Sequence, residues 1–425
     1  MTNVATYSVS AWLNYLENRH GVEIQLGLAR IDELAIKLNL KEINATIITV
    51  GGTNGKGSTV GALEEIYSVA GYQVASYTSP HLLHFNERIR INKKAIDDRY
   101  LCEAFQWLHQ YSESRSLTYF EMTTVAALWI FKQFKLDVII LEVGMGGRLD
   151  ATNIIDADLS IVTTVDFDHQ AYLGHTLEAI GYEKAGIYRC NKPAIYGDTN
   201  PPASLVRYAR DLGSHFLSLG NDFSYVKDQD TITVFNEQMN NLVSLTQVTI
   251  NPKAAVAAVI ASYHLQKKLP VSPKQWQQAL SHLSIPGRLQ AIQYGSLNIL
   301  LDVAHNSQAV NLLANYVASN QPDGKIFAIF SALKDKDLCG LLAPMKGVVD
   351  EWYPALVDSK RAASSEDLKR AFSSVLDQTI VVYERPADSF NQVRQTAGTF
   401  DLIIVYGSFL TVSAVMAELN IASRD

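Results

Sequence analysis

Short apolar runs alternate with amphipathic stretches along most of the chain. Continuous apolar runs of this length are typical of buried strands, and apolar side chains repeated at helical spacing in residues 60–70 and 119–134 predict helices. Strands that alternate with helices favour an α/β fold with a mostly parallel sheet. The first strands predicted in this way are 47–50, 74–77, 138–141 and 159–162, and residues 223–234 predict a hairpin around the polar segment 227–230.

A second series of the same kind begins near residue 285. Pro286-Gly287 breaks the preceding helical stretch, which makes it the candidate boundary between two domains. We predict a larger domain over residues 1–285 and a smaller, Rossmann-like α/β domain over residues 286–425. The strands predicted for the second domain are 299–302, 326–330, 380–383 and 402–406.

The strand at 47–50 runs directly into a glycine-rich loop. A strand, a glycine-rich turn and a helix in this order form a phosphate cradle, since the turn directs N–H groups inward and the helix N-terminus adds positive potential. Lys56 can reach a β- or γ-phosphate, so a nucleoside triphosphate is the expected ligand. The loop residues expected to contact it are Thr53, Asn54, Gly55, Lys56, Gly57 and Ser58.

This loop is a variant of the common P-loop. Val50 stands where the first glycine is usual, and Gly57 separates Lys56 from the hydroxyl pair Ser58-Thr59. A tight turn that merely closes an αβ unit is the alternative interpretation. The strand before the loop, the helix after it and the lysine favour the phosphate site.

Polar side chains also follow other predicted strands, where ligands bind in open α/β sheets. Glu142 closes one strand, and Ser79 and the segment 166–169 follow two others. Taken singly, Glu142 is explained by helix capping and His169 by an ordinary structural role. Beside a phosphate loop, however, a strand-end carboxylate predicts a magnesium site.

Composition narrows the class of protein. The chain has 425 residues, of which 48% are hydrophobic, enough for about two to three domains with large cores. A net charge of -7 disfavours a nucleic-acid partner. Three cysteines without a CxxC pair indicate neither a disulfide framework nor a zinc site. With no leader pattern and no apolar run near the ~20 residues that span a bilayer, we expect a cytoplasmic monomer without membrane or nucleic-acid partners.

Nine short blocks, spread over nearly the whole chain, carry a family resemblance. They are GTNGKGS at 52–58, SPHL at 79–82, TYFE at 118–121, LEVGMGGRLDATN at 141–153, EKAGI at 183–187, PGR at 286–288, DVAHN at 302–306, DKD at 335–337 and GSF at 407–409. In this order the blocks resemble those of the bifunctional dihydrofolate synthase/folylpolyglutamate synthase family, a branch of the Mur ligases.

The resemblance implies an ATP-dependent amide ligase. A carboxylate of dihydropteroate or of a reduced folate takes the γ-phosphoryl group, and the amine of L-glutamate attacks the acyl phosphate. Charge neutralisation by Lys56 and magnesium suits phosphoryl transfer. The implied metal ligands are Ser79, Glu142 and His169, whereas plain P-loop logic nominates Ser58. The implied catalytic residues are Lys56, Lys184 as a carbamylated lysine, and His305.

The same resemblance implies where the substrates bind. Arg288 and Asp302 hold ATP from the second domain, which places the active site between the domains, and His305 and Ser408 are candidates for glutamate. The positions implied for the pterin are Gln25, Leu26, Gly27, Leu28, Thr118, Tyr119, Phe120, Glu121, Leu149, Asp150 and Ala151. Among these, Phe120 offers a stacking face and Asp150 an acceptor for pterin N–H groups.

The chain departs from the family pattern at three places. Lys253 stands where the family has an asparagine that contacts ATP, so its ATP contact is an open question. Ser307 replaces a proline, and Ser331 replaces a glycine. We expect the last two changes to alter loop stiffness more than chemistry.

Other functions use part of the same pattern. A P-loop kinase or NTPase switch needs Lys56 and magnesium but gives no reason for the block at 302–306. A nucleotide-binding module without catalysis is conceivable if Lys253 prevents ATP binding. Within the ligases, the alternatives are a monofunctional folylpolyglutamate synthase and another Mur-type ligase, against which the blocks at 52–58 and 118–121 favour the folate branch.

Overall fold

The computed structural model describes residues 6–19, 25–111, 114, 116–236 and 243–420. The chain divides into two compact units. Unit 1 contains residues 1–80 and 86–283, and unit 2 contains residues 81–85 and 284–424. The division therefore falls two residues before the predicted boundary at 285, and the short segment 81–85 belongs to unit 2, which the sequence did not indicate.

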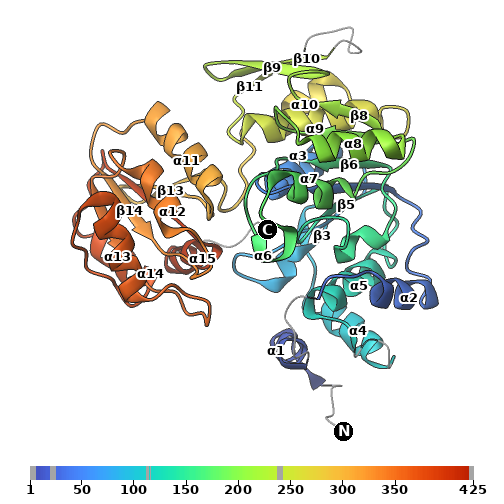
Figure 1. The fold of residues 1–425 in the computed structure, drawn as a ribbon, viewed down its shortest axis with the longest axis horizontal. Helices are drawn as coiled ribbons and strands as arrows, with labels where there is room; N and C mark the ends of the chain where they lie inside the picture. Colours follow the sequence, from blue (N-terminus) through green and yellow to red (C-terminus); the bar gives the residue numbers. More distant parts are fainter. Residues whose placement is uncertain (1–5, 20–24, 112–113, 115, 237–242, 421–425) are drawn as a thin grey trace. The chain divides into compact units, whose positions relative to one another are not determined.

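Unit 1 is built from strands and helices that alternate along the chain (Figure 1). Its helices are α1 (Val9–Arg19), α2 (Ala29–Lys37), α3 (Lys56–Val69), α4 (Asp98–His109), α5 (Tyr119–Phe131), α6 (Gln170–Leu173), α7 (Leu177–Ala185), α8 (Ala203–Leu212), α9 (Pro252–His264) and α10 (Pro273–Leu280). Its strands are β1 (Thr46–Gly51), β2 (Val74–Tyr77), β3 (Ile89–Ile91), β4 (Lys94–Ala95), β5 (Val138–Glu142), β6 (Leu159–Val162), β7 (Pro193–Tyr196), β8 (His215–Ser218), β9 (Phe223–Asp228), β10 (Thr231–Asn236) and β11 (Val243–Thr246). Two short 3-10 helices, η2 (Phe85–Arg88) and η4 (Ala151–Ile154), complete the named elements of the unit.

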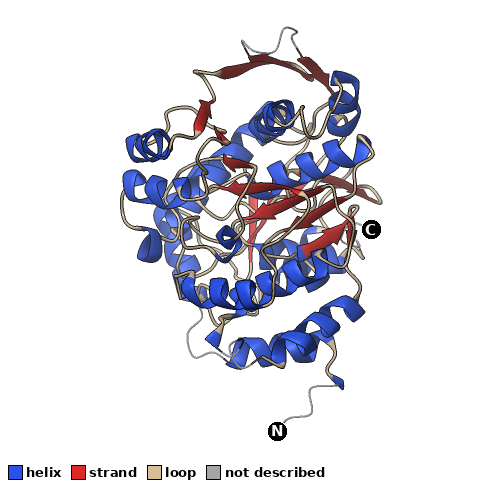
Figure 2. Cartoon of the chain, turned by 90° about the vertical axis from the view of Figure 1, so that its right-hand side faces the viewer, coloured by secondary structure: helices blue, strands red, loops and turns tan. Residues whose placement is uncertain are grey.

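The main sheet of unit 1 has eight strands in the order β4-β3-β2-β5-β1-β6-β7-β8. Pairing is parallel from β2 to β8 and antiparallel at β3 and β4. Figure 2 shows helices on both sides of these strands. Because β1 lies between β5 and β6, the loops that follow these three strands emerge side by side at one edge of the sheet.

The inner strands of this sheet are buried along their whole length, which is why continuous apolar runs in the sequence predicted them. All six residues of β1 and all five of β5 are buried. Helices α3 and α9 pack against each other and both contact the sheet, so they cover the same face. The predicted hairpin is formed by β9 and β10, and β10 also pairs with β11 in a separate three-stranded sheet.

Unit 2 has a five-stranded sheet in the order β12-β13-β16-β14-β15. Alternate residues of each inner strand face opposite cores: Phe327 and Ile329 pack with α14 and α15, whereas Ala328 and Phe330 pack with α11, α12 and α13. The elements are β12 (Gln290–Tyr294), β13 (Leu297–Leu301), α11 (Ser307–Ser319), β14 (Ile326–Phe330), α12 (Leu338–Leu342), η5 (Ala343–Met345), β15 (Glu351–Pro354), α13 (Ser365–Leu376), α14 (Pro386–Val393), β16 (Leu402–Tyr406) and α15 (Phe409–Glu418).

One predicted strand of unit 2 was wrong. Residues 380–383 do not form a strand, and only Tyr383 makes an isolated parallel bridge, to Ala355 just beyond β15. An apolar run cannot form a strand without a neighbour that pairs along its length. The strand predicted at 299–302 is β13, displaced toward the N-terminus, and the helix predicted to reach residue 134 ends at Phe131.

Among the described residues, no helix is both long enough and apolar enough to span a bilayer.

Candidate active site

The glycine-rich loop of residues 51–58, called the phosphate loop below, is fastened to the segment after β6. Thr53 N donates to Thr164 O at 2.9 Å, and Asn54 N donates to Thr164 Oγ1 at 3.0 Å. In return, Thr163 Oγ1 donates to Asn54 O at 2.6 Å. Gly52 has φ +138°, and a Cβ there would lie 1.9 Å from Thr163 Oγ1. Glycine is therefore required at this position by both the backbone angle and the close approach.

Lys56 and the start of α3 form the cationic side of this loop. Lys56 Nζ donates to Gly52 O at 3.0 Å and to Thr53 O at 3.1 Å, so the ammonium lies over the loop. Helix α3 begins after Gly55, which has φ +86° and caps the helix without a side-chain hydrogen bond. An N-terminus of this kind presents backbone N–H groups and positive potential to an anion.

Glu142 lies beside the phosphate loop. It pairs in register with Val50 on the neighbouring strand, one residue before the loop begins. Its side chain is buried, and Oε2 accepts a hydrogen bond of 3.3 Å from Ser79 N at the end of β2. Ser79 and Glu142 are therefore brought together at the carboxyl edge of the sheet, and their role as metal ligands stays a prediction.

His169, the third predicted metal ligand, begins α6 with φ +51°. Its Nε2 lies 3.9 Å from Asp168 Oδ2. Among the residues that the structure describes, no three His, Cys, Asp or Glu side chains form a metal cluster by themselves. A buried carboxylate at a strand end, a serine hydroxyl and an imidazole still fit a divalent ion. Oxygens of water and phosphate would complete the coordination of that ion.

Lys184 is buried at the end of α7. Burial, followed by the positive charge of Lys56, lowers the pKa of Lys184 to about 7, while Asp168 and Asp150 oppose the shift. The charge of Lys56 in the phosphate loop is thus one of the influences on the pKa of Lys184. A lysine with this pKa is partly uncharged near neutral pH, so its amine can act as a nucleophile.

The glycine-rich segment after Glu142 holds α7 in place. A Cβ on Gly147 would lie 2.9 Å from both Glu183 O and Lys184 O, so the two backbones touch. Arg148 N donates to Glu183 O at 2.7 Å, and the Arg148 guanidinium pairs with the Glu183 carboxylate at 2.8 Å. The residue types of this segment thus position Lys184.

The block 118–121 starts α5 with a capping box. Thr118 Oγ1 accepts from Glu121 N at 3.3 Å, and Thr118 N donates to Glu121 Oε2 at 2.8 Å. Phe120 stacks on Tyr77 with ring centroids 6.0 Å apart and planes inclined by 29°. A Cβ on Gly144 would lie 2.6 Å from the Phe120 ring. One face of the predicted stacking ring is therefore occupied by Tyr77.

The neighbouring Tyr119 lies under a cation. The Arg88 guanidinium carbon is 5.8 Å from the centre of its ring. Burial raises the pKa of Tyr119 to about 12, against the influence of Arg88, so this phenol stays protonated at neutral pH.

Asp150, the predicted acceptor for pterin N–H groups, is buried and already accepts internal hydrogen bonds. Oδ2 accepts from Met145 N at 2.9 Å, and Oδ1 accepts from Thr152 N at 3.0 Å and from Thr152 Oγ1 at 2.7 Å. Burial raises the pKa of Asp150, and these hydrogen bonds counteract the shift. The carboxylate holds its own loop and begins η4, and its flanking residues Leu149 and Ala151 lie with it in unit 1. The contact with a substrate stays a prediction.

The first predicted pterin segment, residues 25–28, leads into α2. Arg30 of that helix donates to Gln25 O at 3.0 Å and to Glu121 Oε1 at 2.9 Å. The structure therefore brings the segment 25–28 to the start of α5, and that both belong to a pterin site stays a prediction. The sequence analysis did not identify Arg30.

The predicted residues of unit 2 also cluster. The Arg288 guanidinium carbon lies 4.9 Å from the centre of the Phe409 ring, and the ring centroid of His305 lies 5.9 Å from that of Phe409. His305 Nδ1 donates to Val303 O at 2.9 Å, which fixes the orientation of the ring. Arg288 and His305 thus share one aromatic support.

Asp302 and Ser408 have clear structural tasks in unit 2. Asp302 Oδ2 accepts from Leu289 N at 2.8 Å and Oδ1 from Ala304 N at 2.8 Å, and burial raises its pKa despite these bonds. Ser408 Oγ accepts from Thr411 N at 3.0 Å and caps α15. The proposed glutamate contact of Ser408 competes with this cap and stays a prediction.

Lys253 lies at the start of α9 in unit 1. Its ammonium forms an ion pair with Asp198, which follows β7. Its backbone N donates to Asn251 Oδ1 at 2.9 Å. The charge of Lys253 is thus engaged by a carboxylate, and a contact with ATP stays a prediction.

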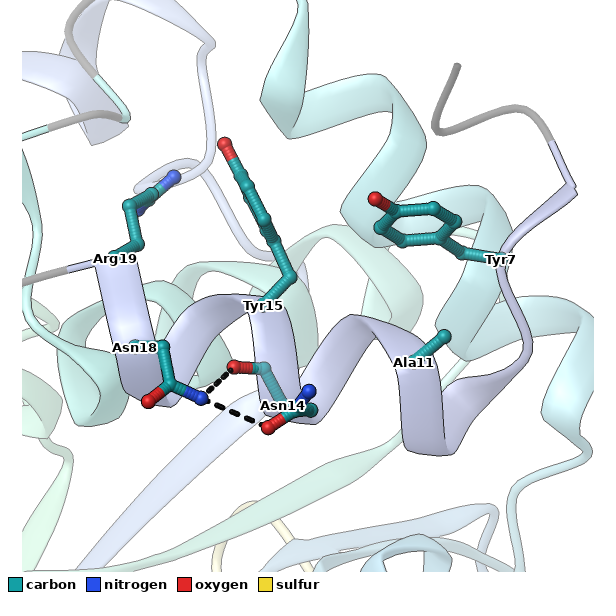
Figure 3. A pocket seen from close by; sticks show the side chains of 6 residues that line it. All are labelled: Tyr7, Ala11, Asn14, Tyr15, Asn18 and Arg19. Carbon is teal, nitrogen blue, oxygen red and sulfur yellow. Dashed lines mark hydrogen bonds between the residues drawn. The ribbon is translucent and has the colours of Figure 1, made fainter. Parts of the chain in front are cut away.

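A further hollow of about 450 Å³ lies along α1 (Figure 3). Asn18 Nδ2 donates to Asn14 O and Asn14 Oδ1, both at 2.8 Å, along its wall. Arg19 donates to Ser114 O at 2.6 Å and to Leu117 O at 3.2 Å, so its charge ties α1 to the segment before α5. None of the predicted site residues lines this hollow. The lining residues are Tyr7, Ala11, Asn14, Tyr15, Asn18 and Arg19.

Sequence reasoning missed residues that are distant in the chain from the predicted site residues and support them through direct contacts. Thr163 and Thr164 hold the phosphate loop, and Phe409 supports Arg288. The two threonines directly follow a predicted strand, so their position at a strand end was a usable signal. Arg30 gave no such signal, because its partner Glu121 is 91 residues away.

Comparisons with known proteins agree with this architecture. Residues 287–409 match the Mur ligase, glutamate ligase domain family. The chain is 38% identical over 423 residues to the dihydrofolate synthase/folylpolyglutamate synthase of Escherichia coli, covering 99% of this chain and 97% of that protein.

Two solved structures have the same fold over nearly the whole chain. FolC of E. coli in complex with DHPP and ADP has a TM-score of 0.91 and 35% identity, with 98% of each chain covered. The Yersinia pestis bifunctional folylpolyglutamate synthase/dihydrofolate synthase complexed with AMPPNP and Mn ion also has a TM-score of 0.91, at 38% identity, covering 99% of this chain and 100% of the other. This chain therefore belongs to the dihydrofolate synthase/folylpolyglutamate synthase family of ATP-dependent ligases.

Proposed function

We propose that this protein joins the amine of L-glutamate to the carboxylate of dihydropteroate and, in a second activity, to that of reduced folates, with conversion of ATP to ADP and phosphate. The observation that carries the proposal is the register between β1 and β5. It places the buried Glu142 directly beside a phosphate loop that contains Lys56. The names of the relatives support both substrates.

The phosphate loop is suited to the triphosphate of ATP. Lys56 donates hydrogen bonds to Gly52 O and Thr53 O. A γ-phosphate is a stronger acceptor than these carbonyls because it is charged, so the ammonium can bind it in their place. The first turn of α3 adds N–H donors. Together they neutralise charge on the transferring phosphoryl group while the substrate carboxylate oxygen attacks phosphorus and the bond to ADP breaks. The glutamate amine then attacks the acyl carbon, loses a proton, and releases phosphate as the amide forms.

Ser79, Glu142 and His169 are the residues proposed to hold magnesium. A bound magnesium ion supplies positive charge to the phosphate oxygens. Lys184 is proposed to carry a carbamate, which reverses its charge. Support comes from its burial and its pKa of about 7, because only the neutral amine adds to CO2.

In unit 2, Arg288 and Asp302 are proposed to bind ATP, with Arg288 held flat by Phe409. His305 is proposed to act on the glutamate side, with its ring oriented by the hydrogen bond between Nδ1 and Val303 O. Segments 25–28, 118–121 and 149–151 are proposed to bind the pterin. Cys102, Cys190 and Cys339 are free thiols, which supports a cytoplasmic location.

One experiment tests the function. Purified protein is incubated with ATP, magnesium and glutamate, separately with dihydropteroate and with tetrahydrofolate, and the products are identified by mass. We expect one added glutamate residue on each substrate and one phosphate released per amide bond. Product from tetrahydrofolate alone would indicate a monofunctional folylpolyglutamate synthase. Phosphate release that does not depend on glutamate would support an NTPase and contradict the ligase.

A further inference from the structure

Arg30 connects two segments of unit 1 that are far apart in sequence. Its Nη2 donates both to Gln25 O at 3.0 Å and to Glu121 Oε1 at 2.9 Å. A Cβ on Gly27 would lie 3.9 Å from Arg30 Nη1, so the backbone of the segment 25–28 passes next to the guanidinium. One cation thus fastens this segment to the first turn of α5.

The position of Arg30 in its own helix is unfavourable. It is the second residue of α2, where a positive charge meets the positive end of the helix dipole. Among the described hydrogen bonds, Arg30 is also the only residue of this helical turn whose side chain bonds to the segment 25–28. A residue type that opposes local helix preference but joins two segments is typical of a functional constraint.

Glu121 binds Arg30 with one oxygen and closes the α5 capping box with the other. Oε2 accepts from Thr118 N at 2.8 Å while Oε1 accepts from Arg30. The Glu121 side chain is 5% exposed and that of Arg30 is 24% exposed, so water screens this pair less than it screens a surface pair. The ordering of α5 and the placement of the segment 25–28 therefore share one carboxylate.

We propose that Arg30 is a positioning residue for the pterin-bearing substrate: it holds the segment 25–28 against the start of α5 and so sets the affinity for that substrate without contributing to ATP binding. This inference rests on the proposed function, because it takes the two segments as walls of the pterin site. Arg30 acts through Gln25 O and Glu121, and no contact with the reacting atoms is required.

The test is a double-mutant cycle in the full-length protein. Glu121→Gln keeps the capping box, which accepts Gln as well as Glu, but removes the charge that faces Arg30. Arg30→Met removes the cation and keeps an unbranched side chain. We expect Arg30→Met, which removes the contacts with both Gln25 O and Glu121, to raise the KM for dihydropteroate roughly tenfold, and Glu121→Gln to raise it by less. The double variant should raise it no further than Arg30→Met, because the contact that Glu121→Gln weakens is already absent from that variant. The KM for ATP and kcat at saturating dihydropteroate should stay within about twofold of the wild type.

Two further variants separate positioning from folding. Arg30→Lys keeps the charge but has a single ammonium in place of the planar fork, so it should recover part of the dihydropteroate affinity. Lys41→Met removes an exposed ion pair of 2.7 Å with the side chain of Asp32, which lies in the same helix as Arg30, and should leave all constants unchanged. If Arg30→Met does not fold, as judged by circular dichroism, Arg30→Lys and Glu121→Gln complete the comparison.

The outcomes distinguish this inference from the proposed function. A wild-type protein that makes no glutamylated product disproves the proposed function. A wild-type protein that is active, with an unchanged dihydropteroate KM in Arg30→Met, overturns the inference alone. Additive effects of the two single variants, or an equal rise in the KM for ATP, would also overturn it.

Discussion

Gly52 and Thr163 lie so close that a Cβ on the glycine would come within 1.9 Å of Thr163 Oγ1 and 2.9 Å of Thr163 N. The contact joins the phosphate loop to the segment after β6. Since Thr163 also donates to Asn54 O, the shape of the loop depends on a strand that follows it by more than a hundred residues in the chain.

We predict that Gly52→Ala displaces the phosphate loop and lowers kcat/KM for ATP by roughly a hundredfold or more, because misplacing a positioned donor has effects of this size. Gly71→Ala is the matched control. Gly71 also has a positive φ, of +90°, but a Cβ there meets nothing within 4 Å. It should lose about 1 kcal/mol of stability through backbone strain and keep its activity. Equal losses of activity in the two variants would show that backbone angle alone matters.

Lys56→Ala should abolish ligation and leave the fold intact. In the described structure Lys56 Nζ donates to two loop carbonyls, Gly52 O and Thr53 O, and Lys56 is only partly buried. Loss of one phosphate-neutralising charge is expected to lower kcat roughly a hundredfold or more. Lys268→Ala, which removes an exposed lysine paired with Asp158, serves as the control. Near-normal turnover by a folded Lys56→Ala protein would contradict the phosphate-loop assignment.

Glu142→Gln should weaken the response to magnesium. The substitution keeps the size of a buried side chain and an oxygen that can accept from Ser79 N, but removes the charge proposed to hold the ion. Initial rates measured across a magnesium titration should show a severe loss, with at most partial recovery at high magnesium. Unchanged activity and an unchanged magnesium midpoint would identify Glu142 as a structural residue.

The fold could be predicted because its signals are local, and local signals also nominated the site residues, whose roles stay predictions. A continuous apolar run, a glycine-rich turn and a strand-end carboxylate each lie within a few residues, and the family resemblance was confirmed by relatives that cover nearly the whole chain. Long-range contacts gave no such signal. Tyr383 makes only a single bridge to Ala355, so the apolar run at 380–383 misled the prediction.

Asp150 shows a second limit of sequence reasoning. The sequence identifies a carboxylate with acceptor oxygens, but it does not reveal that Met145 N and Thr152 already donate to both of them. The same holds for Ser408, whose hydroxyl caps α15. Residue type therefore predicts what a group can bind, and only the fold shows how much of that capacity is used internally.

Asp150→Ala should accordingly reduce stability as well as substrate affinity. Removal of a buried acceptor leaves Met145 N and Thr152 N without their partner, at a cost of about 1–3 kcal/mol in the free energy of unfolding. Thermal unfolding and the KM for dihydropteroate are measured together, with the KM for ATP as the control. Phe120→Ala should also raise the KM for dihydropteroate, because it deletes the ring that is predicted to stack on the pterin and that stacks on Tyr77 with its other face. An unaltered dihydropteroate KM alongside impaired ATP binding would place the pterin elsewhere.

Lys184 should make activity depend on dissolved CO2. Its pKa of about 7 leaves about half of the amine uncharged at neutral pH, whereas an ordinary lysine, near pKa 10.4, is almost fully charged. The neutral nitrogen attacks the carbon of CO2 and releases a proton, which gives a carbamate anion. In CO2-depleted buffer we expect reduced activity that bicarbonate restores, and a carbamate signal by carbon-13 NMR after addition of labelled bicarbonate.

The lowered pKa of Lys184 also determines how the free energy of unfolding changes with pH, and this change is a control for carbamylation. Without the carbamate, folded Lys184 binds fewer protons than the unfolded chain between pH 7 and about 10.4, so this residue makes the free energy of unfolding rise with pH across that range. Lys184→Ala should lose this pH dependence, the NMR signal and the response to bicarbonate together. Lys192→Ala, at a half-exposed lysine paired with Asp158, should retain all three. A wild-type protein that shows the pH dependence but neither the signal nor the bicarbonate response would mean that Lys184 acts as a neutral buried amine and is not carbamylated.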